Sequence, residues 1–331
     1  MRVLSAIQPT GSIHLGNYLG ALRHWVTLQD RNECFFEIAD LHSLTTGLAP
    51  NERAANTLGT AAILLAIGIE PSRATLFVQS QVHQHAELAW ILNCFTHLGE
   101  LRRMTQFKAK AQARHANPTV GLFVYPVLQA ADILLYHAES IPVGEDQIQH
   151  LELARDLAER FNRKFGKTFT VPKAFVARTG ARIMNLQDPR TKMSKSAGPP
   201  QGVIQLTDTP DGIQRKIRGA VTDSGSEVIS SSEKPALTNL LSIYSAMANQ
   251  DVRDVERSFA GTGYAKFKQA LADLVVGTLR PIHERYAFWT ANSRDLSLEL
   301  EKGASHAEST ASATLREVDE RVGLLSFRKE N

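Results

Sequence analysis

The sequence lacks the features that mark metal-binding, secreted and membrane proteins. Its 331 residues contain two cysteines, Cys34 and Cys94, and neither belongs to a C-x-x-C pair. This argues against structural zinc or an iron–sulfur cluster, and it suits a reducing compartment. No apolar run reaches the ~20 residues that span a bilayer, and no signal or transit peptide is visible before the first predicted strand. We therefore expect a cytoplasmic protein with no membrane contact and no protein-bound metal ion.

A large excess of charge is missing as well. The formal net charge is only +3, which does not by itself indicate a nucleic-acid-binding protein. Residues 201–331 hold 16 Lys and Arg against 18 Asp and Glu, whereas the first 200 residues hold 21 against 16. No acid occurs between Glu100 and Asp132, a stretch that contains Arg102, Arg103, Lys108, Lys110 and Arg114. Such a run is either a solvated helix face or a place where a triphosphate or an RNA stem is neutralised.

Short apolar runs alternate with helical periodicity in the first third of the chain. This alternation predicts parallel strands with right-handed crossovers, which is an α/β fold with a Rossmann-like nucleotide-binding sheet. The active site of such a sheet lies at the carboxyl ends of the strands, where loops 8–17 and 39–42 are expected. The predicted strands are 3–7, 34–38, 75–79 and 174–177, and the predicted helices are 18–28, 51–67 and 87–98, the last of which should end at Gly99.

The remainder of the chain is predicted to be mostly helical. Residues 101–165 form a helical pattern with a short apolar piece at 141–143, so we expect a helical insertion at about 101–170. The length suits two domains, which we place at 1–205 and 206–331, the second all-helical. Its predicted helices are 209–220, opened by Thr209 and Pro210, then 237–248, 252–259, 265–291 and 304–325.

The loop after the first strand has the features of a phosphate-binding turn. Gln8-Pro9-Thr10-Gly11 breaks the strand, and the segment from Ser12 to Asn17 leads into the helix. A glycine-containing loop at a helix start offers backbone N–H groups and the positive end of the helix dipole. His14 and Asn17 can donate hydrogen bonds to phosphoryl oxygens. The alternative is an ordinary strand-to-helix turn with a surface histidine.

Two pairs of motifs carry a resemblance to a known family. Lys192-Met193-Ser194-Lys195-Ser196 resembles the lysine loop of class I aminoacyl-tRNA synthetases, and His14-Leu15-Gly16-Asn17 resembles their histidine–glycine signature, with Asn in place of the usual final His. The stretches 130–136 and 142–147 are similar to the amino-acid pocket of the bacterial-type tryptophanyl-tRNA synthetases. The resemblance runs from Ser5 to about Asp223 and more loosely to the C-terminus.

This resemblance implies a reaction and its participants. L-Tryptophan is activated by ATP to tryptophanyl-adenylate, pyrophosphate leaves, and the aminoacyl group is transferred to tRNA(Trp). One Mg²⁺ is expected to bridge the ATP phosphates. The family also implies a homodimer, with the tRNA anticodon on the helical domain. Because charge develops on pyrophosphate, two ammonium groups on a loop that closes and reopens suit the chemistry; the alternative is a basic surface loop.

The resemblance also assigns roles to individual residues. Met193 should anchor the lysine loop by packing, Gly144 and its acidic neighbours should contact the ribose, and the backbone of Ile183 should contact the adenine unless this isoleucine is simply core. Gln106 and Lys110 either reach ATP after loop closure or are surface residues. The catalytic residues implied are His14, Lys192 and Lys195. The ATP contacts implied are Gln8, Pro9, Thr10, Gly16, Asn17, Gly144, Glu145, Asp146, Ile183, Lys192, Met193, Ser194, Lys195 and Ser196.

Asp132 is the residue expected to select tryptophan. It lies in a helix, 127–136, that is apolar almost all round, where a carboxylate is costly unless it is satisfied. The resemblance makes it the acceptor of the indole N–H; the alternative is a capped or salt-bridged structural aspartate. Gln129 lies on the same face, where some relatives carry methionine. The other implied tryptophan contacts are Ser5, Gln8, His42, Gln129, Val143 and Gln147, with Leu4 and Ile141 nearby.

Three competing interpretations remain. The related tyrosyl enzymes share the fold and both signatures, although the stretches 130–136 and 142–147 favour tryptophan. A catalytically idle paralogue that acts as an RNA-binding partner should have lost His14, Lys192 or Lys195, and all three are present. A small nucleotidyltransferase with the histidine–glycine loop does not explain the helical last third of the chain.

Overall fold

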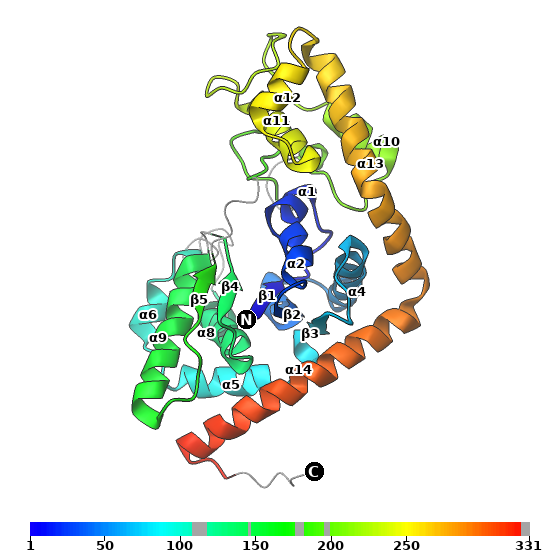
Figure 1. The fold of residues 1–331 in the computed structure, drawn as a ribbon. Coiled ribbons are helices and arrows are strands. Elements are labelled where there is room, and N and C mark those ends of the chain that lie inside the picture. The colour runs from blue at the N-terminus through cyan, green and yellow to red at the C-terminus, as the bar shows by residue number, and fades with distance from the viewer. Residues whose placement is uncertain (108–117, 145–146, 176–181, 195–198, 326–331) are drawn as a thin grey trace.

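A computed structural model of the protein describes residues 1–107, 118–144, 147–175, 182–194 and 199–325. Its centre is a five-stranded sheet in the order β3-β2-β1-β4-β5, and every pairing is parallel (Figure 1). This confirms the predicted α/β fold with a Rossmann-like sheet. The strands are β1 Arg2–Ile7, β2 Glu33–Ile38, β3 Ala74–Val78, β4 Ser140–Pro142 and β5 Lys173–Phe175.

The sheet is covered on both faces, which explains why its strands are continuous apolar runs. Successive residues of a strand point to opposite faces. Along β2, Phe36 and Ile38 belong to one buried cluster with apolar residues of α4 (Pro50–Ile67) and α13 (Gly263–Ala291). Phe35 points the other way, into a second cluster with α5 (Gln84–Asn93) and α8 (Val120–Leu135).

The helices that complete the first part of the chain follow the predictions with two differences. The first difference is that the expected helix 18–28 begins earlier, because His14 caps α1. The second is that the expected helix 87–98 ends earlier than predicted. That helix stops at Asn93, and a capping box in which Glu100 accepts from His97 N opens a new helix that contains Gly99. The elements are α1 Leu15–Asn17, the π-helix η1 Tyr18–Leu22, α2 Arg23–Leu28, α3 Asp40–Ser43, η2 Leu44–Thr46, η3 Gln79–Gln81, α6 Leu98–Arg102 and α9 Ile148–Phe165.

The stretch expected to be a helical insertion, 101–170, is not purely helical. β4 lies within it and pairs with β1 on one side and β5 on the other. Three residues are too few to show a strand pattern in the sequence, yet their pairing on both sides places them inside the sheet. The chain between α6 and α9 therefore supplies a sheet strand as well as helices.

Helices predominate after the lysine loop, as predicted. They are η5 Pro200–Gly202, α10 Pro210–Arg218, α11 Pro235–Ala248, α12 Val252–Ser258, α13 and α14 Ser293–Val322. Thr209 caps α10, since its hydroxyl accepts from Gly212 N. Within the described residues, no helix has both the length and the apolar character needed to span a bilayer.

The last helix returns to the sheet. In Figure 1, α13 runs down one side of the molecule and α14 crosses beneath β3 and α5. Ala307, Ala311 and Leu315 of α14 are fully buried in the cluster that also contains α5 and α8. The chain beyond residue 205 is therefore not packed only on itself, because its final helix covers the sheet edge.

The contact of α14 with β3 leaves no room for a side chain at Gly303. A Cβ built there would lie 1.8 Å from the carbonyl oxygen of Leu76 and 2.8 Å from its carbonyl carbon. We predict that Gly303→Ala lowers the free energy of unfolding by about 1–3 kcal/mol, as overpacking does elsewhere, measured by urea denaturation.

Gly277→Ala is the matched control. Gly277 lies in α13, and a Cβ there would meet nothing within 4 Å. Alanine should raise the stability by up to ~1 kcal/mol through helix propensity. Equal effects of the two substitutions would contradict the close packing of α14 on β3.

Candidate active site

His14 is held in a fixed orientation at the start of α1. Its Nδ1 accepts a hydrogen bond from Asn17 N at 3.2 Å, and Asn17 Oδ1 accepts from His14 N at 3.2 Å. This reciprocal cap makes Nδ1 an acceptor, so the proton of the neutral ring lies on Nε2. The predicted turn after β1 is thus confirmed as a helix start, and His14 is buried, contrary to the alternative of a surface histidine.

The histidine–glycine loop is paired with the chain that follows the lysine loop. Leu15 N donates to Ile204 O at 2.8 Å, and Leu206 N donates to Ile13 O at 2.8 Å. At Gly16, an added Cβ would lie 3.1 Å from His14 Nδ1 and 3.5 Å from Met193 Cβ. The two signature segments, far apart in the sequence, therefore meet at Gly16.

A short hairpin presents Lys192. Met193 N donates to Ile183 O at 2.9 Å, and Asn185 N donates to Thr191 O at 2.9 Å. Lys192 is exposed, whereas Met193 is buried in the cluster that contains Ile13 and Leu15, which confirms its expected anchoring role.

Ile183 is also buried in that cluster, so its side chain is core, as the alternative interpretation held, while its backbone remains the predicted adenine contact. Lys195, Ser196, Glu145, Asp146 and Lys110 lie outside the described residues.

Asp132 of α8 is the centre of a buried hydrogen-bond network. His42 Nε2 lies 2.8 Å from Oδ2, while Gln79 Nε2 and His85 Nδ1 lie 2.8 Å and 2.7 Å from Oδ1. An ionised carboxylate only accepts, so each of these atoms donates. Three donors from three different elements converge on this carboxylate, which is 2% exposed.

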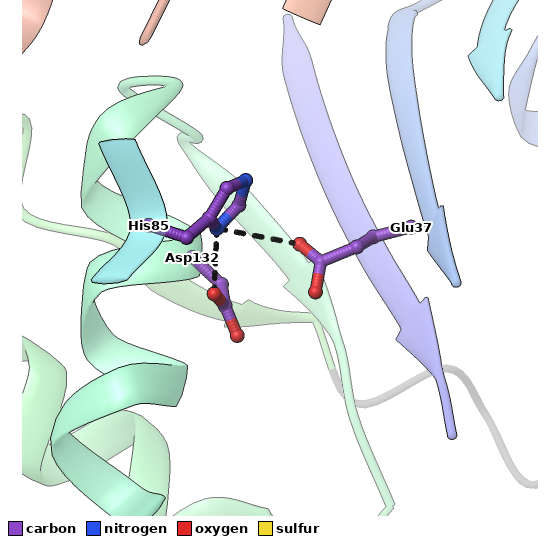
Figure 2. Close-up of side chains that lie close together, drawn as sticks. All are labelled: Glu37, His85 and Asp132. Carbon is purple, nitrogen blue, oxygen red and sulfur yellow. Dashed lines mark hydrogen bonds and ion pairs between the residues drawn. The ribbon is translucent and has the colours of Figure 1, made fainter. Parts of the chain in front are cut away.

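Glu37 faces this network from β2. Figure 2 shows His85 between the two acids, with Asp132 approaching from the helix and Glu37 from the strand. His85 Nδ1 lies 3.9 Å from Glu37 Oε2, too far for a hydrogen bond. Both Glu37 oxygens are buried and have no hydrogen-bond partner among the described residues. The atoms that Glu37, His85 and Asp132 could offer to a metal ion lie within 4.8 Å of one another. However, the hydrogen bond between Asp132 and His85 already uses two of these atoms.

The two acids carry different charges. Burial raises the pKa of Glu37 well above its usual range, and the nearby charges of Asp132 and Asp40 raise it further. Burial also opposes ionisation of Asp132, yet hydrogen bonds from His42 and His85 outweigh it and lower the pKa of Asp132 to about 2. The hydrogen bonds to Asp132 therefore favour its ionised form, while burial and the neighbouring charges favour the protonated form of Glu37, a division that is typical of functional sites.

The other predicted pocket residues lie around α8 and the start of α9. Gln129 Nε2 donates to Gln147 Oε1 at 3.3 Å, which brings two of them together. Gln147 N donates to Gly144 O at 2.9 Å, so the described part of the ribose loop is closed by a turn. Ser5, Gln8, Pro9, Thr10, His42 and Val143 lie on β1, the loop after it, α3 and the loop after β4, and their ligand roles stay predictions.

Sequence reasoning missed several residues of this network. Gln79, at the carboxyl end of β3, and His85, in α5, both donate to Asp132. Tyr136 completes it, because its hydroxyl lies 2.8 Å from His85 Nε2. The position of Gln79 at a strand end was the one available signal, whereas nothing in the pattern around His85 or Glu37 distinguished them from other polar residues.

Comparison with known proteins agrees with this geometry. Residues 1–280 match the family model described as tRNA synthetases class I (W and Y). The chain is 50% identical to tryptophan–tRNA ligase 2 of Streptomyces avermitilis, over 98% of this chain and 97% of that protein. The crystal structure of tryptophanyl-tRNA synthetase from Mycoplasma pneumoniae has a TM-score of 0.89 at 37% identity and covers 98% of both chains.

The same enzyme from Campylobacter jejuni, solved as a complex with ADP and tryptophan, has a TM-score of 0.85 at 34% identity, over 98% of this chain and 100% of that one. The chain therefore belongs to the class I tRNA synthetases. Within that class, the near-complete match to tryptophan–tRNA ligases places it in the tryptophanyl family.

The unpaired Glu37 generates a pH-dependent prediction. Because its pKa is raised from 4.5 in the folded protein, the folded state binds more protons than the unfolded state above that pH, and stability falls as pH rises toward the folded pKa. Glu37→Gln removes this loss. The stability advantage of the variant should grow as the pH rises above 4.5 toward the raised pKa of the folded protein, by up to ~1.4 kcal/mol per pH unit, measured by urea unfolding.

Glu33→Gln on the exposed end of the same strand is the control, and it should show no such growth. A difference between Glu37→Gln and wild type that is flat with pH would mean that Glu37 is already ionised in the folded protein.

Proposed function

We propose that this chain activates L-tryptophan with ATP to tryptophanyl-adenylate and transfers the aminoacyl group to tRNA(Trp). The observation that carries this proposal is the meeting of the two signature segments at Gly16, where Met193 of the lysine loop packs beside His14. ATP bound at the start of α1 would have the lysine loop as its neighbour. Family membership supports the reaction, and the contact at Gly16 supports the proposed positions of its residues.

The activation step requires positioning and charge stabilisation rather than a covalent nucleophile. A carboxylate oxygen of tryptophan attacks the α-phosphorus, the bond to the β-phosphate oxygen breaks, and pyrophosphate leaves with its negative charge. The ammonium of Lys192, exposed on one arm of its hairpin, and the Nε2–H of His14 are suited to that charge. Lys195 is proposed for the same role. Mg²⁺ is proposed to be held by the phosphates of ATP.

Asp132 is proposed to choose tryptophan. Its Oδ1 accepts from both Gln79 and His85, while Oδ2 has one donor, His42. A carboxylate offers about four acceptor positions, which leaves capacity on Oδ2 for the indole N–H. The ionised acceptor favours a substrate whose ring carries a donor, as the indole N–H of tryptophan does. An analogue without the N–H would leave the acceptor unpaired.

Further proposals concern the macromolecular partners. The helices after residue 205 are proposed to bind the tRNA anticodon. A cavity of about 440 Å³ between α10 and α13 is lined by Arg218, Tyr264 and Lys268, a combination of cations and an aromatic ring that suits a nucleotide.

A homodimer is proposed as well. Trp90 on α5 is 72% exposed and Leu98 on α6 is 63% exposed, and a second copy would cover them. A protein that charges tRNA is expected in the cytoplasm, where translation takes place.

The test is tryptophan-dependent exchange of pyrophosphate into ATP, with Asp132→Asn as the variant. The amide nitrogen replaces one carboxylate oxygen, turns a donor toward the partners of that oxygen and removes the charge, so kcat/KM for tryptophan should fall about 100-fold or more, as expected for loss of a charged hydrogen bond of ~3 kcal/mol. ATP binding should stay within about 2-fold, because Asp132 does not belong to the His14 or Lys192 segments.

Asp156→Asn, on the exposed face of α9, is the control and should exchange like wild type. Unchanged exchange by Asp132→Asn would refute the specificity role, and exchange that depends on tyrosine instead would assign the chain to the sister enzymes.

A further inference from the structure

We propose that Asn239 of α11 is a positioning residue that holds the lysine loop in place for the reaction. The proposal rests on the function above, because it concerns how Lys192 is presented to ATP. No resemblance or motif singled out Asn239, which lies 47 positions beyond Lys192 in the helical part of the chain. Its contacts are with the backbone of the hairpin that carries Lys192.

The side chain of Asn239 clamps one residue at both of its backbone polar groups. Met184 N donates to Asn239 Oδ1 at 2.8 Å, and Asn239 Nδ2 donates to Met184 O at 2.9 Å. Asn239 is 5% exposed, so these hydrogen bonds are shielded from water. A carboxamide matches an N–H and a C=O of the same residue, as a neighbouring strand would, and it is neutral at every pH.

Met184 is paired in turn with Lys192. The two residues form an antiparallel bridge, and the bond from Met193 N to Ile183 O lies directly beside it. The hairpin is closed at its turn by Asn185, whose Oδ1 accepts from Gln187 N at 2.8 Å. Displacement of Met184 would therefore be transmitted to Lys192 through backbone hydrogen bonds.

The opposite side of the hairpin touches the histidine–glycine loop. Met193 packs at Gly16, where an added Cβ would lie 3.5 Å from Met193 Cβ. The hairpin is thus held between α11 on one side and the His14 segment on the other. The geometry makes the position of the Lys192 ammonium relative to His14 depend on the carboxamide of Asn239.

A purely structural role makes a different prediction from a positioning role. Loss of the clamp leaves the buried N–H and C=O of Met184 unpaired, which lowers stability in either case. Only a positioning role makes the catalytic effect depend on Lys192. Groups that act as one unit are non-additive, and a double-mutant cycle measures this directly.

The experiment compares Asn239→Leu, Lys192→Ala and the double variant in tryptophan-dependent pyrophosphate exchange. Asn239→Leu keeps a similar shape and removes both hydrogen bonds. We expect its kcat to fall about 10- to 100-fold, because a displacement of ~1 Å costs up to about 100-fold. Its dissociation constant for tryptophan should be unchanged. In the Lys192→Ala background, the same substitution should change kcat less than about 2-fold.

Two further variants make the result decisive. Ser242→Ala removes a hydroxyl of α11 that donates to Thr238 O of the same helix, and it should exchange like wild type. Asn239→Asp keeps the acceptor for Met184 N but turns a carboxylate oxygen toward Met184 O in place of the donor, so a fall in kcat is expected here as well. It provides a second test where Asn239→Leu fails to fold.

Multiplicative effects of Asn239→Leu and Lys192→Ala, or normal kcat in both Asn239 variants, would overturn the positioning role. Loss of the native thermal transition in both Asn239 variants would overturn it too, since the residue would then be part of the core alone. Wild-type protein without tryptophan-dependent exchange would instead overturn the proposed function, so the two failures are distinguishable.

Discussion

The site depends on the close approach of two segments that the sequence separates by about 175 residues. The segments meet at Gly16, where an added Cβ would lie 3.1 Å from His14 Nδ1 and in ordinary contact with Met193 Cβ at 3.5 Å. Backbone bonds from Leu15 to Ile204 and from Leu206 to Ile13 pair the His14 segment with the chain that follows the lysine loop. These are main-chain interactions, so they require few particular side chains. The His14 segment is therefore fixed by backbone pairing to the chain after the lysine loop, and it meets the lysine loop itself at Gly16 and Met193.

The sequence predicts the sheet well where a strand is buried on both faces, and poorly where pairing alone defines it. β1, β2 and β3 are apolar runs of five or six residues and were located within a residue or two. β4 has three residues, which are too few to show the alternating pattern of a strand. Its place between β1 and β5 is set by pairing with strands that are distant in the sequence. The end of α5 was misplaced because Gly99 was taken as a stop signal, whereas the His97–Glu100 cap starts a helix there.

The candidate site shows the same limit. Asp132 was recognisable because a carboxylate in an apolar helix needs partners. Its partners were not, since His42, Gln79 and His85 come from three elements that only the fold brings together. Motif resemblance located His14 and Lys192 because their chemistry is tied to local sequence. The motifs did not include Glu37 or Asn239, because their proposed roles depend on contacts with residues that are distant in the sequence.

The pKa of Glu37 is raised and that of Asp132 is lowered, so the buried site favours a single negative charge, on Asp132. Two carboxylates facing the same imidazole would repel each other, and burial would raise the cost of both. Three donors converge on Asp132 and leave Glu37 with none among the described residues, so ionisation is confined to the acid that faces the predicted indole position. Both acids are buried, so burial alone does not distinguish them. The hydrogen bonds to Asp132 are what favour ionisation of this acid over Glu37. The proposed acceptance of the indole N–H depends on this asymmetry, because a protonated acid at 132 would compete as a donor itself.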